Sequence, residues 1–178
     1  MGDDGTGTTG WSLASMGLGA RERGWLRASA GLLAILVAWL HLLHPEYGYQ
    51  RLLLYVELGT LYDPRPPLFV LSGLAIFVGV VLAYYDVHRR PIYLAGIALM
   101  LTYLLGYVAW HTILDHGAFW PHIEPHHHHD VGVLESMIDH LRGDVIALLS
   151  KTVEAALLAV LLVLYLVDDD DGHGNPDA

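Results

Sequence analysis

The chain has 178 residues, of which 54% are hydrophobic and 16% are charged, a balance too apolar for a soluble domain of this length. Its net charge is -10, and the acidic residues gather mainly near the two ends, so no basic surface for nucleic acid is expected. The absence of cysteine excludes disulfides and thiolate metal sites. A single lysine, Lys151, and acidic ends suit a protein from a halophilic source.

Four apolar segments are long enough to form helices that cross a bilayer, since a helix rises about 1.5 Å per residue and the hydrocarbon is ~30 Å thick. They are residues 25–43, 68–85, 92–114 and 145–167. Residues 1–22 are rich in Gly, Ser and Thr and are predicted to be a flexible tail, and residues 168–178 a second, acidic tail. We therefore predict an all-α fold, an integral membrane four-helix bundle over residues 23–167.

Two shorter segments between these spans are predicted to be helices that lie in the outer membrane interface. Residues 47–61 are semi-apolar and are followed by a breaker, the proline-rich stretch 63–67. The second segment lies between the third and fourth spans, where apolar residues recur at helical spacing. They are Val131, Leu134, Ile138 and Leu141.

Arginines predict the orientation, because positively charged residues favour the cytoplasmic side. Three arginines precede the first span, and Arg89 and Arg90 occupy the turn between the second and third. Both termini are therefore expected in the cytoplasm, with the protein in the cell membrane. Three other arginines count against this orientation because they fall on the outer side: Arg51, Arg65 and Arg142.

Histidine is distributed unevenly: ten of the twelve histidines fall on the predicted outer side, whichever way the bundle is oriented. His41 and His44 are three residues apart on one helix, while His111 and Asp115 are four apart on another, so each pair shares a helix face. The predicted metal ligands are His41, His44, His111, Asp115, His116, His126, His127, His128, His129 and His140.

Imidazole and carboxylate groups bind zinc or copper when thiols are absent, and three or four of them complete a zinc site. The spacing matches no defined metal motif, and the run of four histidines from 126 to 129 is a signal of composition rather than geometry. The alternatives are interfacial histidines bonded to loop carbonyls and a solvated loop.

Lys151 and Glu154 lie three residues apart inside the fourth span, and Glu154 is expected near the middle of the membrane. An ionisable residue there is costly, so a functional site with Lys151 as its partner is one interpretation. A self-neutralising pair, with Lys151 extended towards the interface, is the other. The hydroxyl groups of Thr102, Ser150 and Thr152 are weaker candidates, because such groups commonly bond to their own helix backbone.

Three functions follow from these patterns. The first is handling of a divalent transition metal, zinc or copper, by uptake, efflux or delivery to a partner. The second is a non-catalytic accessory or anchoring subunit without metal. The third is a membrane-embedded metal-dependent hydrolase with Glu135 or Glu154 as base. Besides the lipid bilayer, the expected partners are further copies of the chain or a larger membrane complex.

Overall fold

The computed structural model describes residues 18–61, 63–112, 114, 135, 138 and 141–168. Within these residues every regular element is a helix, as predicted. The predicted second interfacial helix falls largely outside the described residues, although Ile138 and residues 141–143 are helical.

Four long helices have the length and apolar composition to cross a membrane. They are α1 (Ala20–Leu42), α3 (Arg65–Tyr84), α4 (Arg89–His111) and α6 (Val145–Val167). The protein is thus a multi-pass membrane protein. Four helix ends differ by three to five residues from the predicted spans. Helix α1 begins inside the predicted flexible tail, where Glu22 accepts a hydrogen bond from the backbone N–H of Gly19.

The predicted breaker before the second span forms the start of α3 instead. Pro66 and Pro67 occupy the first turn of α3. A backbone N–H there would have no acceptor within the helix, so proline, which lacks an N–H, loses no hydrogen bond. Pro91 lies in the first turn of α4 for the same reason, so α4 begins before its predicted start. At its other end α4 stops at His111, three residues before the predicted end.

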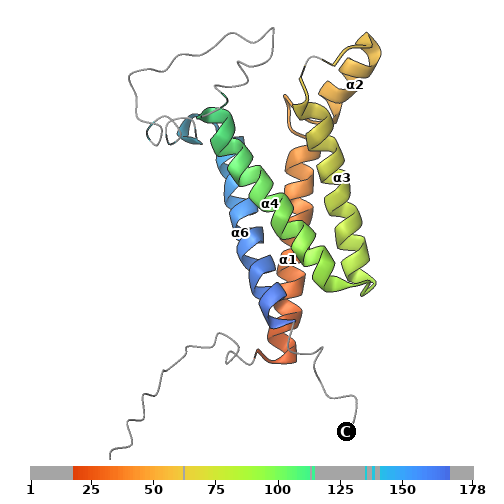
Figure 1. Ribbon diagram of the computed structural model, residues 1–178, viewed down its shortest axis with the longest axis vertical. Coiled ribbons are helices and arrows are strands. Elements are labelled where there is room, and N and C mark those ends of the chain that lie inside the picture. Colours follow the sequence, from red (N-terminus) through yellow and green to blue (C-terminus); the bar gives the residue numbers. More distant parts are fainter. Residues whose placement is uncertain are drawn as a thin grey trace, which may run out of the picture.

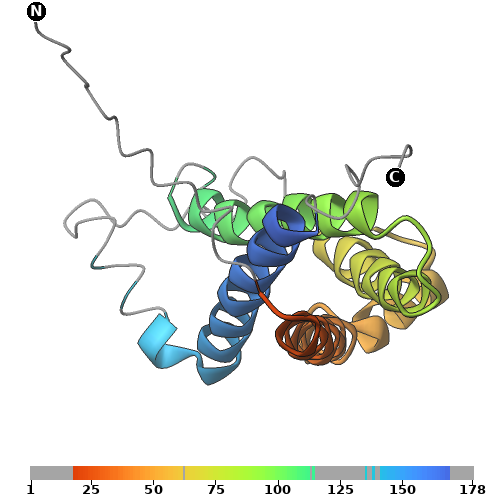
Figure 2. The same ribbon diagram turned by 90° about the horizontal axis from the view of Figure 1, so that it is seen from below.

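The helices pack so that α1 contacts α3 and α6, and α6 also contacts α4 (Figure 1, Figure 2). Their common interior is apolar and includes Val37 and Ala38 of α1, Met100 of α4, and Leu157 and Leu164 of α6. Most other large apolar side chains are exposed on the outside of the bundle. In a bilayer these side chains contact lipid, so the interior of this protein is narrow.

The two ends of the bundle carry different elements, and they are called the α2 end and the terminal end. The α2 end carries α2 (Tyr49–Leu58), a short helix between α1 and α3 that matches the first predicted interfacial helix (Figure 1). The terminal end carries the start of α1, the end of α6 and the tight turn from α3 to α4. Asp86 and His88 in this turn have positive φ angles of 61° and 42°.

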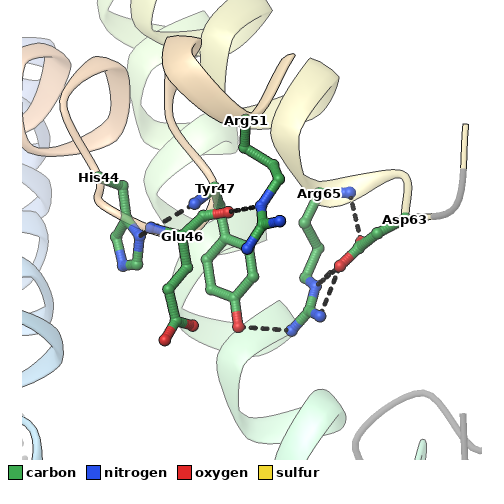
Figure 3. A network of polar contacts seen from close by, with 6 residues as sticks. All are labelled: His44, Glu46, Tyr47, Arg51, Asp63 and Arg65. Carbon is green, nitrogen blue, oxygen red and sulfur yellow. Dashed lines mark hydrogen bonds and ion pairs between the residues drawn. The ribbon is translucent and has the colours of Figure 1, made fainter. Parts of the chain in front are cut away.

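A polar network joins α2 to the spans at the α2 end (Figure 3). The Arg65 guanidinium binds the Asp63 carboxylate, donates to the Tyr47 hydroxyl at 3.1 Å and lies over the Tyr47 and Trp110 rings. Burial raises the pKa of the Tyr47 phenol to about 12, so this hydroxyl stays protonated at physiological pH. Arg65, which counts against the predicted orientation, thus has its charge balanced by Asp63.

Candidate functional site

The carboxylate of Glu154 lies inside the bundle, on the side of α6 that faces α1. Its side chain has no solvent exposure, and it lies nine residues into α6, about 14 Å from the start of the helix. The Lys151 ammonium donates to Glu154 Oε2 at 2.6 Å, the contact expected from their spacing. Because Lys151 is still 18% exposed, it forms the outer edge of the pair towards the α2 end.

Ser150 contributes a second donor to the same carboxylate. Its hydroxyl donates to Glu154 Oε1 at 2.7 Å, one helical turn away. The expectation that the three hydroxyls bond to their own backbone holds for Thr102 and Thr152, which donate to the carbonyls four residues earlier. For Ser150 it is wrong, since a buried carboxylate is a stronger acceptor than a carbonyl already used by the helix.

His41 of α1 brings a base to the same place from another span. Its side chain is 1% exposed, and Nδ1 lies 2.9 Å from the carbonyl of Val37. A carbonyl can only accept, so Nδ1 carries the hydrogen and, in the neutral ring, Nε2 presents a lone pair. Nε2 lies 3.7 Å from Glu154 Oε1. Two lone pairs therefore face each other in the interior, at a distance too long for a hydrogen bond.

Aromatic rings enclose this pair of bases. The His41 ring stacks on Tyr103 of α4 with centroids 4.2 Å apart, and Phe69 of α3 lies 4.7 Å away on another side. The Lys151 ammonium lies 5.8 Å from the centroid of Tyr103 and 5.3 Å from that of Tyr107. All four spans thus contribute side chains. These rings keep water from the bases and favour a cation among them.

The other described members of the predicted metal set border this cluster: the His44 ring lies 5.5 Å from that of Phe69, and the His111 ring lies 4.2 Å from that of Tyr107. His44, in the loop after α1, accepts at Nδ1 from the backbone N–H groups of Glu46 and Tyr47 (Figure 3). Burial lowers the pKa of His44, which favours the neutral ring that these bonds require. Nδ1 of His111 at the end of α4 lies 2.8 Å from the Tyr107 carbonyl.

Within the part of the chain that the structure describes, no three His, Asp or Glu side chains are placed to hold one metal ion. The remaining predicted ligands lie outside the described residues: Asp115, His116, His126, His127, His128, His129 and His140.

The contact between His41 and Glu154 was missed by the sequence analysis. We grouped His41 with His44 because three residues on a helix share a face. Its actual neighbours along α1 are the buried residues Val37 and Ala38, which lie four and three residues before it. That spacing places His41 on the interior stripe of the helix, and it was the available signal.

No family model matches the chain, and neither a curated protein nor a solved structure does. The fold and the cluster define a multi-pass membrane protein that carries ionisable side chains between its helices. A function for it has to be argued from the chemistry of that cluster.

Proposed function

We propose that this chain is a proton-linked membrane protein that takes up a proton between His41 Nε2 and Glu154 Oε1. The observation that carries the proposal is the 3.7 Å approach of His41 Nε2 to Glu154 Oε1, with both side chains buried. Hydronium gives up a proton and becomes water, an N–H bond forms at Nε2, and the two facing lone pairs become an imidazolium and carboxylate ion pair. The same site without the proton holds a repulsive contact.

The charge already present favours a proton over a divalent metal at this position. Lys151 and Glu154 neutralise each other, so each added positive charge is uncompensated. At roughly 5 Å and an effective dielectric constant of about 20, a unit charge repels the ammonium by about 3 kcal/mol, and a divalent ion by about twice that. The 3.7 Å gap exceeds a hydrogen bond, so α1 and α6 must approach slightly before an N–H at Nε2 can bond to Oε1.

Several other titratable groups face the two bases. Lys151 faces them from α6, Tyr103 and Tyr107 lie on α4, and His44 lies beyond the end of α1. The residue that α3 packs against His41 is Phe69, which does not titrate. Uptake of a proton changes the force between α1 and α6, because Nε2 and Oε1 then attract each other. We therefore expect protonation to alter the packing of these two helices.

The test is nuclear magnetic resonance of the protein labelled with ¹⁵N-histidine in lipid nanodiscs, with the His41 signals assigned by their loss in His41→Gln. We expect a neutral His41 ring with hydrogen on Nδ1 alone, which gains a second N–H at Nε2 on acidification. In Glu154→Gln the signal of that second N–H should shift, because its carboxylate partner is gone. The matched control is Thr102→Val, which removes a hydroxyl bonded only within α4.

Two outcomes would refute this proposal. One is the opposite tautomer, with hydrogen on Nε2 of the neutral ring. The other is a His41 ring whose protonation does not change over the whole pH range in which the protein stays folded. Both are read from the ring itself, so they do not depend on what the protein does in the cell.

A second candidate function is capture of a divalent transition metal, zinc or copper, at the α2 end. The observation that favours it is the position of His111, the last residue of α4, whose Nδ1 contact with the Tyr107 carbonyl fixes the ring orientation. Such a partner commonly orients a histidine that ligates metal. Asp115, His116 and the run from 126 to 129 follow His111 in the sequence.

The metal test is isothermal titration calorimetry with zinc or copper(II) salts, on tag-free protein in detergent. We expect binding that falls at least tenfold when His111, Asp115 and His116 are replaced by alanine. His41→Gln is the control, because His41 belongs to the interior cluster and should leave metal affinity unchanged. Equal affinity in the triple variant and the unmodified chain would end the metal proposal.

A further inference from the structure

A second polar contact joins α1 to α6, at the terminal end. The Arg27 guanidinium donates to Asp168 Oδ1 at 2.9 Å, and Tyr93 of α4, which is buried, interacts with both partners. Asp168 directly follows the last residue of α6 and is only 11% exposed. Asp168 belongs to the segment predicted to be an acidic tail, so its contact with α1 is a departure from the prediction.

The two polar contacts between α1 and α6 are in register. Fourteen residues separate Arg27 from His41, and fourteen separate Glu154 from Asp168. The helices run in opposite directions, so His41 meets Glu154 at one level and Arg27 meets Asp168 at another. Fourteen residues are about four turns, or roughly 21 Å, so both contacts fall on nearly the same face of each helix.

The stretch between the two contacts is apolar and closely packed. Ala30, Val37 and Ala38 of α1 are buried, as are Leu157, Leu161 and Leu164 of α6. Alanine side chains let the two helices approach closely, and no polar side chain is buried between the levels of Glu154 and Asp168 on the described part of α6. Water from the terminal end therefore meets the ion pair first and an apolar barrier behind it.

Within the described part of the chain, the ion pair of Arg27 and Asp168 leaves two buried polar atoms without a hydrogen bond. Arg27 Nε and Asp168 Oδ2 are both buried and have no hydrogen-bond partner within the described residues. An arginine and a carboxylate can form two parallel hydrogen bonds, but one is present here. Each buried atom without a partner loses its bonds to water, which offsets much of the gain from the ion pair. The net stabilisation from this ion pair is therefore modest.

We infer that Arg27 and Asp168 form a gate that closes the α1–α6 contact at the terminal end and opens by separating these helices. Its role as the regulator of access to His41 and Glu154 rests on the proposed function. When closed, the gate and the apolar stretch separate the cluster from the terminal end, and among the described residues Lys151 is its exposed edge towards the α2 end. When open, the cluster faces the terminal end.

The chain has no cysteine, so a single introduced thiol reports on the gate without background. The reporter is Leu164→Cys, at a position with no solvent exposure one turn before Asp168. The full chain in nanodiscs is treated with a membrane-impermeant maleimide, and the labelling rate is measured. We expect Asp168→Asn and Arg27→Gln each to raise this rate about tenfold, the change that corresponds to about 1.4 kcal/mol.

The matched control is Asp86→Asn, which removes an acid of the α3–α4 turn at the same end of the bundle, paired there with Arg89 at 2.8 Å. It should leave the rate unchanged. The double variant Arg27→Asp with Asp168→Arg should restore slow labelling, which a misfolded protein would not do. A rate in Asp168→Asn equal to that of the parent would overturn the gate. Because the maleimide reaction does not involve His41, a failed histidine titration would leave this result standing.

Discussion

Glu154→Ala should lower the free energy of unfolding by about 3–5 kcal/mol, because it leaves the Lys151 ammonium partly buried without its counter-ion. The hydroxyl of Ser150 loses its acceptor in the same variant. Glu154→Gln should cost less, since the amide keeps the shape and one acceptor oxygen, and Lys151 can extend towards the α2 end. The measurement is unfolding by denaturant in detergent micelles, followed by circular dichroism.

The double variant Glu154→Ala with Lys151→Ala separates a lost ion pair from a simple cavity. Removing both charges should recover part of the stability that Glu154→Ala loses, because no uncompensated charge then remains. Glu57→Ala, at an exposed position of α2, serves as a control that removes a glutamate outside the bundle. If the double variant is no more stable than Glu154→Ala, the uncompensated charge of Lys151 is not the cause of the lost stability.

The second large effect is expected at Gly48, the residue that caps the start of α2. A Cβ atom built there would lie 2.5 Å from the carbonyl oxygen of His44 and 2.8 Å from its nitrogen, and would also strike the Leu42 carbonyl. These are backbone atoms that cannot turn away. Gly48→Ala should therefore displace the loop that follows α1 and cost several kcal/mol, on the order of an overpacked core.

The readout for Gly48→Ala is the melting temperature of the protein in detergent, together with proteolysis between α1 and α3. We expect a lower melting temperature and faster cleavage near α2. Gly31→Ala provides the matched control, because a Cβ at Gly31 of α1 meets nothing within 4 Å and alanine favours helix. If Gly48→Ala melts at the same temperature as Gly31→Ala, the close approach at this loop does not constrain the fold.

Helix type and number could be predicted from sequence because the bilayer imposes a length on every apolar segment. The errors lie at the ends of α1, α3 and α4, where hydrophobicity is a poor guide. Local chemistry sets those ends: Glu22 bonds back to the Gly19 backbone, and prolines occupy the first turns of α3 and α4. Helices α3 and α4 therefore begin at the charged residues Arg65 and Arg89, whereas the apolar segments used for prediction begin three residues later.

The candidate site could be predicted only where its members share a helix. The spacing of Lys151 and Glu154 brings them together in any α-helix, so this contact follows from sequence. His41 meets Glu154 because α1 is turned and shifted against α6 in one particular way. The spacing of residues within one span does not predict that rotation or that shift. The spacing that singled out His41 paired it with His44, whereas its charged interior partner lies on another span.

Helix α3 has consequences for how much of this protein can vary. Only 6% of its most apolar window is buried inside the bundle, against 17–22% for the other three spans. Its close approach to α1 runs through Gly73, where a Cβ would meet the Leu42 side chain at 2.8 Å. Where α3 faces lipid, the hydrocarbon accommodates any aliphatic side chain about equally well. We therefore expect the lipid-facing positions of α3 to tolerate exchange among aliphatic residues, whereas Gly73, and Phe69 against His41, should tolerate little change.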